Sequence, residues 1–330
     1  MVSKIQEKIF SGEKFNFEEI ALSLFEFQYF NNPIYRQFTD YLHIDFKKVQ
    51  SISQIPFLPI DFFKTHSVIT QNASIEKIFE SSGTTGQITS KHLVADVSLY
   101  EQSFINGFDL FYRKATDWII LALLPSYLER NTSSLVYMVD DLIKKTNSEH
   151  SGFYLNNLQE LAEKIVYLKE NKTNKKILLI GVTFALLDFA EQFPMNLSEV
   201  VIMETGGMKG RRKEMMREEV HVILKQNFNA FHIHSEYGMT ELLSQGYSAG
   251  EGVFKTPPWM KILKRDIYNP LQVSANIGRG ALNVIDLANI YSCAFIATQD
   301  LVNIISDTTF EIIGRTDNSD IRGCNLMVAL

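Results

Sequence analysis

Residues 230–241 read Ala-Phe-His-Ile-His-Ser-Glu-Tyr-Gly-Met-Thr-Glu, a short apolar run that leads directly into a polar turn containing glycine. The first part, Ala230 to His234, is typical of a buried strand. In open α/β sheets, ligands bind beyond the carboxyl ends of the strands. This stretch therefore indicates an α/β fold whose functional residues begin at Ser235.

Similar patterns extend outward from this stretch in both directions. Other apolar runs predict buried strands at Trp118 to Leu124, Lys176 to Gly181, Glu199 to Met203 and Thr309 to Ile313. Helical spacing relates Met216, Val220, Ile223 and Leu224. The first seventy residues are helical and aromatic, as in Glu18 to Phe30. Together these patterns predict an α/β fold with a mixed, partly parallel sheet.

Composition excludes several classes of protein. The 330 residues carry 32 Lys and Arg against 38 Asp and Glu, a net charge of −6, so we expect no nucleic-acid partner. The basic residues 209–213 precede acidic ones and are expected to be a solvated helix start. No apolar run is long enough to span a membrane. Two cysteines, Cys293 and Cys324, form no disulfide framework, so a cytoplasmic location is expected.

The strongest local motif is a loop rich in hydroxyls and glycine: Ser81, Ser82, Gly83, Thr84, Thr85 and Gly86. Its glycines allow successive N–H groups to converge on an anion, and its four hydroxyls add donors. The loop is not a Walker motif, because no Gly-Lys-Ser/Thr closes it. The alternative interpretation is a flexible surface turn.

Two further turns follow predicted strands. Thr205 precedes Gly206 and Gly207, and the later turn contains Tyr237, Gly238, Met239, Thr240 and Glu241. A tyrosine ring can stack on a base, a threonine can reach a phosphate oxygen, and a carboxylate can bind Mg²⁺. The alternative is a strand-to-helix turn in which Glu241 lies in the first helical turn, where the helix dipole favours acids.

The last motif residues are charged. Asp300 follows the apolar segment Ala294 to Thr298, and Arg315 and Asp317 lie in a turn-rich stretch. Asp300 and Arg315 are candidates to bind ribose. The alternative for each is a surface charge or an ion pair.

In this order along the chain, the motifs resemble the signature of the adenylate-forming superfamily, which includes the acyl-CoA ligases and phenylacetate-CoA ligases. The resemblance runs from about Pro56 to Cys324. It implies the large-domain fold of these enzymes over residues 1–314, with a helical part at 1–70. Residues 315–330 would form a hinge and a short tail.

The resemblance also implies roles for the motif residues. The loop at residues 81–86 would surround the β- and γ-phosphates of ATP, and Gly206 and Gly207 would flank the adenine. Tyr237 would stack on that base, with Gly238 and Met239 in the same turn. Thr240 would contact the α-phosphate and Glu241 would bind Mg²⁺. Asp300 and Arg315 would hold the ribose, and Asp317 would be the hinge.

Two features depart from the common ligase pattern. The loop lacks the usual Pro-Lys, since Gln87, Ile88 and Thr89 follow Gly86, a variation similar to the phenylacetate-type branch. The chain ends sixteen residues after Gly314, so most of the usual C-terminal domain and its catalytic lysine are not expected here.

This short form resembles the acyl-protein synthetases (LuxE-like). By that resemblance, a fatty acid would be activated with ATP and Mg²⁺ and passed to Cys324 as a thioester, for delivery to an acyl-reductase partner. Two alternatives stay open. One is an acyl- or aryl-CoA ligase, and the other is a catalytically inert nucleotide-binding subunit of a reductase complex.

Overall fold

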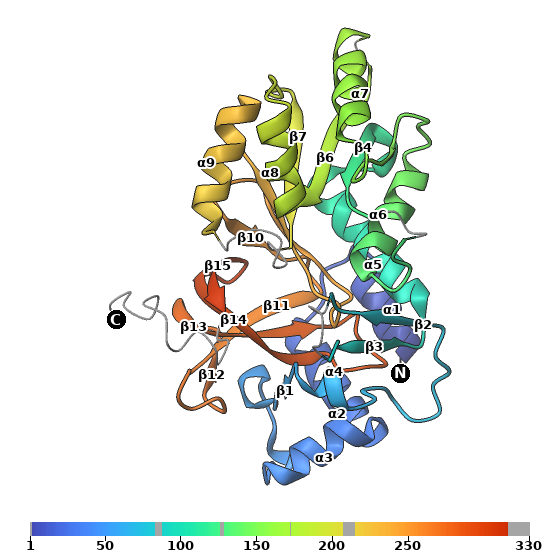
Figure 1. Cartoon of the computed structure of the whole chain (residues 1–330). Helices are drawn as coiled ribbons and strands as arrows, with labels where there is room; N and C mark the ends of the chain where they lie inside the picture. The colour runs from blue at the N-terminus through green and yellow to red at the C-terminus, as the bar shows by residue number, and fades with distance from the viewer. Residues whose placement is uncertain (1, 83–87, 126–128, 172, 207–214, 316–330) are drawn as a thin grey trace. The chain divides into compact units, whose positions relative to one another are not determined.

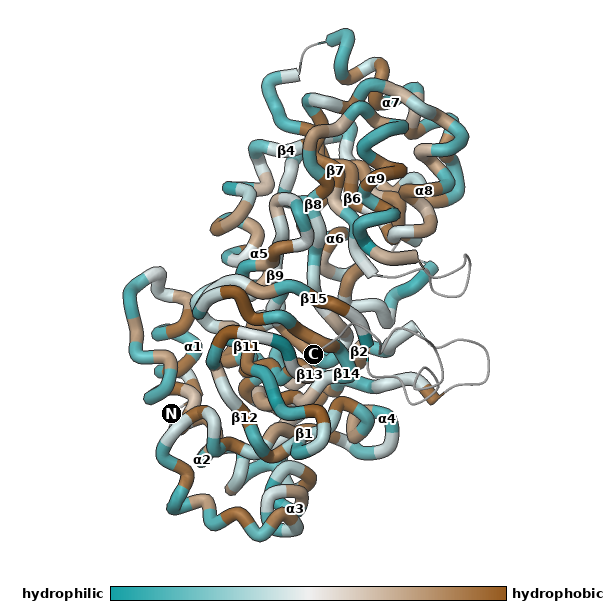
Figure 2. Tube along the Cα trace, turned by 90° about the vertical axis from the view of Figure 1, so that its left-hand side faces the viewer, coloured by the Kyte–Doolittle hydropathy of each residue, from teal (hydrophilic) through white to brown (hydrophobic). Residues whose placement is uncertain are grey.

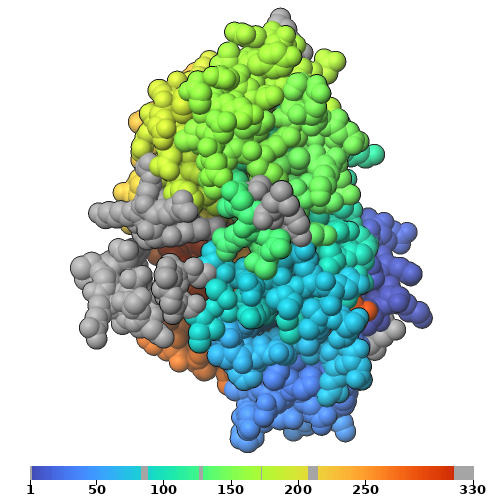
Figure 3. All heavy atoms as spheres, turned by 45° about the vertical axis from the view of Figure 1, so that its right-hand side comes forward, coloured from blue at the N-terminus to red at the C-terminus, as the bar shows by residue number. Residues whose placement is uncertain are grey.

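The computed structural model describes residues 2–82, 88–125, 129–171, 173–206 and 215–315, which are coloured in Figure 1, Figure 2 and Figure 3. The chain forms two compact units. One comprises Ile75–Pro257 and the other comprises Met1–Ser74 with Pro258–Leu330, each as far as its residues are described. The motif residues are divided between them, so each unit has its own part of the predicted site.

The unit Ile75–Pro257 is built on a mixed sheet. Its strands run in the order β10 (Val253–Lys255), β9 (Gly246–Ser248), β8 (His234–Tyr237), β7 (Val200–Thr205), β6 (Lys176–Val182), β4 (Trp118–Leu123) and β5 (Gly152–Phe153). From β8 to β5 the neighbours are parallel, whereas β9 and β10 are antiparallel. A separate hairpin pairs β2 (Lys77–Glu80) with β3 (Lys91–Val94).

Five α-helices of this unit follow the strands in sequence. They are α5 (Val97–Tyr112), α6 (Ser134–Lys145), α7 (Leu158–Glu170), α8 (Thr183–Gln192) and α9 (Arg217–Phe228), with the 3-10 turn η3 (Ala115–Asp117) before β4. Polar side chains cap their first turns: Ser133 accepts from the Val136 amide and Asn157 from the Glu160 amide. Helices α8 and α9 lie side by side (Figure 1). Together these elements confirm the predicted α/β fold.

The parallel strands are held by close apolar packing. Every residue of β4 is buried, and so are six of the seven residues of β6, consistent with the hydrophobic stretches along the central strands in Figure 2. A Cβ added at Gly181 would lie 2.8 Å from Leu123 Cβ, so only glycine permits this approach of β6 to β4. The strands predicted near residues 118, 176 and 199 are therefore confirmed.

The strand predicted at Ala230 to His234 lies elsewhere. Asn229 adopts a left-handed conformation with φ +49° and ends α9, and the Ala230 amide still donates to the Lys225 carbonyl. Residues 230–233 therefore form the connection between α9 and the next strand, and β8 begins only at His234. As a result Tyr237 is the last residue of the strand and does not follow it.

The second unit combines helices with an antiparallel sheet. Its helices are α1 (Val2–Phe10), α2 (Phe17–Asn31), α3 (Pro33–Tyr41) and α4 (Phe62–Thr65), with 3-10 turns η1 (Phe46–Lys48) and η2 (Ile52–Gln54). The sheet order is β12 (Val273–Ser274), β11 (Met260–Arg265), β13 (Gly278–Asp286), β14 (Phe295–Ser306) and β15 (Thr309–Arg315). Strand β1 (Leu58–Pro59) pairs parallel with β14. The strand predicted at Thr309 to Ile313 is thus confirmed.

Helix α2 is joined to the segment before β14 by a buried glutamine. The Gln28 Nε2 donates to the carbonyls of Asn289 at 2.9 Å and Ile290 at 2.8 Å, and its Oε1 accepts from the Ala294 amide at 3.0 Å. Aromatic packing continues the contact, with the rings of Tyr35 and Phe295 stacked at 5.9 Å. The first seventy residues are therefore anchored by hydrogen bonds as well as by apolar burial.

We predict that Gln28→Leu lowers the free energy of unfolding by about 3 kcal/mol, because it removes three buried hydrogen bonds, two to carbonyls and one from an N–H. Urea denaturation would measure this loss, with Gln71→Leu as a control at an exposed glutamine of the same unit. Equal stability of the two variants would contradict the role given to Gln28.

Candidate functional site

Two buried carboxylates lie at the ends of neighbouring parallel strands. Glu204 and Thr205 end β7, and they face Ser235 and Glu236 of β8 in the strand register. Thr205 Oγ1 donates a short hydrogen bond to Glu236 Oε2. A Cβ at Gly238 would collide with Glu236 Oε1, so the glycine of the motif makes room for this carboxylate.

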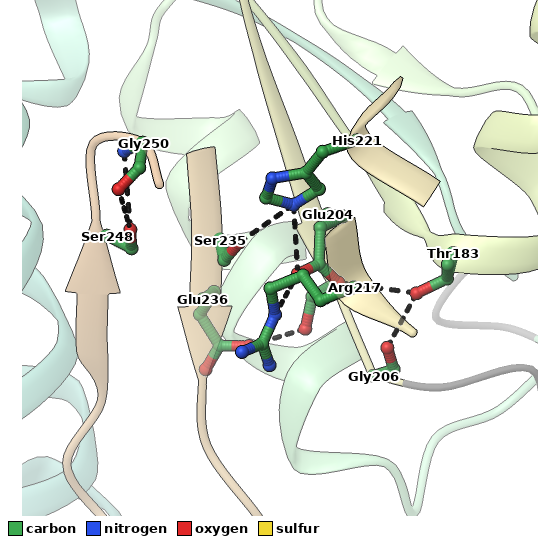
Figure 4. Close-up of polar contacts among 10 residues, drawn as sticks. Thr183, Glu204, Gly206, Arg217, His221, Ser235, Glu236, Ser248 and Gly250 are labelled. Carbon is green, nitrogen blue, oxygen red and sulfur yellow. Dashed lines mark hydrogen bonds and ion pairs between the residues drawn. The ribbon is translucent and has the colours of Figure 1, made fainter. Parts of the chain in front are cut away.

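Glu204 has cationic and polar partners from α9 and β8. Arg217 Nε lies 3.2 Å and His221 Nε2 lies 3.8 Å from Glu204 Oε1, and the His221 nitrogen is 3.5 Å from Ser235 Oγ (Figure 4). Burial alone would raise the pKa of Glu204. The contacts with His221, Arg217 and Ser235 outweigh burial and hold the pKa below its ordinary value, so the carboxylate is charged at neutral pH.

The Gly206 carbonyl, directly after β7, accepts a hydrogen bond from a hydroxyl at the start of α8. Thr183 Oγ1 lies 2.7 Å from the Gly206 carbonyl oxygen and 3.3 Å from Glu204 Oε2 (Figure 4). Gly206 has φ +68°, a left-handed conformation that glycine adopts at little cost. Gly206, the first glycine of the predicted adenine turn, is exposed. The hydrogen bond from Thr183 fixes the direction of its carbonyl group.

The hairpin of β2 and β3 connects the predicted phosphate loop with the turn after β8. At the base of the loop, the Ser81 amide donates to the Ser90 carbonyl at 3.0 Å, and the Ser90 amide donates to Ser81 Oγ at 2.9 Å. On β3, His92 Nδ1 lies 2.8 Å from the Thr240 carbonyl oxygen. Because a carbonyl only accepts, His92 carries its proton on Nδ1. One buried histidine thus ties the strand after the loop to the motif threonine.

Tyr237, at the end of β8, and Glu241, in the turn that follows, have distinct environments. Tyr237 is buried, with its ring 6.0 Å from that of Phe254, and the Arg217 guanidinium lies 5.0 Å from the Phe254 ring. Glu241 is 4% exposed and lies in a turn, not in a helix, so the first-helical-turn alternative for Glu241 is wrong. The Leu242 amide donates to the Met239 carbonyl at 3.1 Å and closes this turn.

The second unit contains the predicted ribose residues. Asp300 lies within β14 and is the register partner of Arg315 on β15. Arg315 Nε is 3.3 Å from Asp300 Oδ1, and the Asp300 side chain is 12% exposed against 64% for Arg315. From the sequence, Asp300 was expected to follow an apolar segment. The structure instead has it inside a long strand whose residues alternate between buried and partly exposed positions.

Some predicted residues lie outside the described part of the chain: Gly83, Thr84, Thr85, Gly86, Gly207, Asp317 and Cys324. Ser82 is described and exposed. Among the described residues no group of three His, Cys, Asp or Glu side chains forms a metal centre. Glu241 can still act as a single carboxylate ligand, because Mg²⁺ in nucleotide sites uses one or two carboxylates together with phosphates and waters.

The sequence did not single out several residues that build this site: Thr183, His92, Glu204, Arg217 and His221. One signal was present, since Glu204 is a charged residue at the carboxyl end of an otherwise apolar run. His92 carried no such signal, because its partner is 148 residues away.

Comparison with protein families identifies the chain. The family model of the acyl-protein synthetase LuxE matches residues 6–329. The chain belongs to the LuxE acyl-protein synthetase family. It is therefore a ligase of the kind that adenylates an acid and transfers the acyl group, and the predicted superfamily is confirmed.

Solved structures support the same fold for this LuxE-family chain. A 2-hydroxyisobutyryl-CoA ligase with 2-HIB-AMP and CoA in the thioesterification state is similar with TM-score 0.65 and 13% identity, over 96% of this chain and 69% of that one. An open conformation of the same ligase gives TM-score 0.62 and 12% identity, over 91% and 69%. No curated protein sequence matches. None of the described helices is both long and apolar enough to cross a membrane.

We predict that the negative charge of Glu204 stabilises the folded LuxE-family protein at pH values at which this carboxyl group is ionised. The folded state has the lower pKa, so the unfolded chain binds the proton more readily, and the stabilisation is lost as pH falls below about 4. At pH 7, Glu204→Gln should lose about 3 kcal/mol.

Urea denaturation from pH 7 to pH 3 would test this. The difference in the free energy of unfolding between wild type and Glu204→Gln should become smaller as the pH is lowered. Glu199→Gln, at an exposed glutamate just before β7, is the control and should show little difference at any pH. If the difference in the free energy of unfolding between wild type and Glu204→Gln does not change with pH, Glu204 is not a charged group in the folded protein.

Proposed function

We propose that this protein activates a fatty acid with ATP and passes the acyl group to its own Cys324, from which an acyl-reductase partner receives it. In the first step a carboxylate oxygen of the acid bonds to the α-phosphorus, and pyrophosphate leaves. In the second step the cysteine thiolate bonds to the acyl carbon, and AMP leaves. Membership of the acyl-protein synthetase family supports this order of steps.

The observation that carries the proposal is the hydrogen bond between His92 and the Thr240 carbonyl, at 2.8 Å. It joins the strand after the Ser81–Gly86 loop to the turn that contains Glu241 and directly follows Tyr237. An adenylating site needs phosphate donors, a base-stacking ring and a metal carboxylate within the length of one nucleotide. The proposal is supported by the placement of Ser81, Tyr237 and Glu241 in a single unit.

Each group has a role that its chemistry suits. Backbone N–H groups and hydroxyls of residues 81–86 would bind the β- and γ-phosphates, which offsets the repulsion between the attacking carboxylate and the triphosphate. Tyr237 would stack on adenine beside Gly206 and Gly207, and Thr240 would donate to the α-phosphate. Mg²⁺ bound at Glu241 would supply positive charge at the phosphates. Asp300 and Arg315 would bind the ribose, and Asp317 would act as the hinge.

Cys324 is the better candidate for the acceptor because Cys293 is unsuited to the role. Cys293 is fully buried in the second unit, and burial raises the pKa of its thiol to about 12. A thiol is nucleophilic as the thiolate, so Cys293 would be almost unreactive at neutral pH.

We predict that Cys324→Ser still makes acyl adenylate but forms no thioester. The protein would be incubated with ATP, Mg²⁺ and radiolabelled fatty acid and then treated with neutral hydroxylamine, which cleaves thioesters. Wild type should carry a hydroxylamine-labile label, and Cys324→Ser should carry none.

Cys293→Ser is the matched control and should keep both adenylation and the label. Label retained on Cys324→Ser would refute this acceptor. Acyl-CoA as the product would favour the alternative acyl- or aryl-CoA ligase, and failure to form any adenylate would favour the inert nucleotide-binding subunit.

We also predict that Glu241→Gln slows adenylation by about 10²–10³-fold, because it removes the charge that holds the metal at the phosphates. Hydroxamate formation from the acyl adenylate would measure the rate. Glu251→Gln, at an exposed glutamate of the same unit, should adenylate at the wild-type rate. Normal adenylation by a folded Glu241→Gln would reject the metal role.

A further inference from the structure

Strand β14 contains a β-bulge immediately before and at Asp300. In the pairing with β13, Ala281 faces Leu301, but Asn283 already faces Ala297. One residue of β13, Leu282, is therefore opposite three residues of β14, at positions 298–300. Such bulges re-aim a side chain, and they are common next to active sites. Asp300 is the last of these three residues, so the bulge ends at its backbone.

The guanidinium of Arg265, on β11, bridges the two sides of this bulge. Its Nη1 donates to the Leu282 carbonyl at 2.5 Å and to Asn283 Oδ1 at 2.8 Å, and its Nη2 donates to the Thr298 carbonyl at 2.6 Å. These carbonyls lie where the regular ladder of β13 and β14 is interrupted. Arg265 therefore replaces the strand hydrogen bonds that the bulge removes.

A hydroxyl extends this network to Asp300 itself. Thr298 Oγ1 donates to the Leu282 carbonyl at 3.1 Å and accepts from the Asp300 amide at 3.1 Å. Arg265 and Thr298 thus meet at the same carbonyl oxygen, and the Asp300 backbone is one hydrogen bond further on. The Asp300 charge also raises the pKa of Arg265 against the larger lowering by burial, so the two groups interact electrostatically.

We propose that Arg265 is a positioning residue for the nucleotide: it fixes the bulge of β14 in the one conformation in which the Asp300 carboxylate can accept from the ribose hydroxyls. The inference deepens the proposed function, because it rests on Asp300 as the ribose residue. The proposed role of Arg265 involves no contact with ATP. It acts through the backbone of residues 298–300.

The experiment compares the binding of ATP and 2′,3′-dideoxyATP by isothermal titration calorimetry with Mg²⁺ and without acid. Hydrogen bonds to a charged group contribute enough that wild type should bind the dideoxy analogue about 10–100-fold more weakly. Arg265→Gln should bind ATP weakly, with the ratio of the two dissociation constants reduced to nearly 1. Asp300→Asn should reduce that ratio similarly, and the double variant should reduce it no further.

Two further variants separate positioning from general loss of structure. Thr298→Val keeps the side-chain shape but removes the hydroxyl that holds the Asp300 amide, so its ratio should also fall. Arg279→Gln, at an exposed arginine of β13, should keep the wild-type ratio. A merely structural effect would weaken both nucleotides equally and leave the ratio unchanged.

A wild-type ratio retained in both Arg265→Gln and Thr298→Val would overturn the proposal, and so would wild type that does not distinguish the two nucleotides. Failure of the proposed function is a separate outcome. If the ratio behaves as expected but no acid is adenylated, the positioning role of Arg265 stands and the enzymatic proposal falls.

Discussion

The burial of the Glu204 carboxylate at the end of β7 is the constraint on which the arrangement of the unit Ile75–Pro257 depends. A buried carboxylate is unfavourable unless cations and donors surround it. Arg217 and His221 supply the charge and the polar contact, which fixes the start of α9 against β7. Thr183 lies near the same carboxylate and donates to the Gly206 carbonyl, so the direction of that carbonyl is coupled to the environment of one glutamate. The Glu236 carboxylate likewise accepts a hydrogen bond from Thr205, and it leaves no room for a side chain at Gly238.

The second unit solves a comparable problem with a guanidinium. The bulge in β14 leaves carbonyl groups without ladder partners, and Arg265 donates to them from β11. Each unit thus contains a charged side chain that hydrogen-bonds or pairs with buried polar groups from other elements. Removal of one such partner is costly, because the groups that it served stay buried.

The sequence predicted the α/β class, most strands of the parallel sheet and the superfamily, because apolar runs and short motifs are local signals. The predicted start of a strand was less accurate where a helix ends just before it. Asn229 ends α9 in a left-handed conformation, so β8 begins four residues later than the apolar run from Ala230 suggested. Partners distant in sequence could not be predicted: His92 and Thr240 are 148 residues apart, and only the fold brings them together. Arg265 carried no signal either, since its role depends on a bulge that exists only after β13 and β14 pair. The roles of Thr84, Thr85 and Cys324 remain predictions from the family resemblance.

We propose that this chain couples ATP to the activation of an apolar carboxylic acid. The most direct test is exchange of radiolabelled pyrophosphate into ATP by wild-type protein with Mg²⁺, measured over a panel of straight-chain acids of increasing length. Exchange needs only the reversible adenylation step, so it does not depend on the acyl acceptor. We expect exchange that requires an acid and becomes faster as the apolar chain of the acid becomes longer. Fastest exchange with short polar acids, or none with any acid although ATP binds, would contradict it.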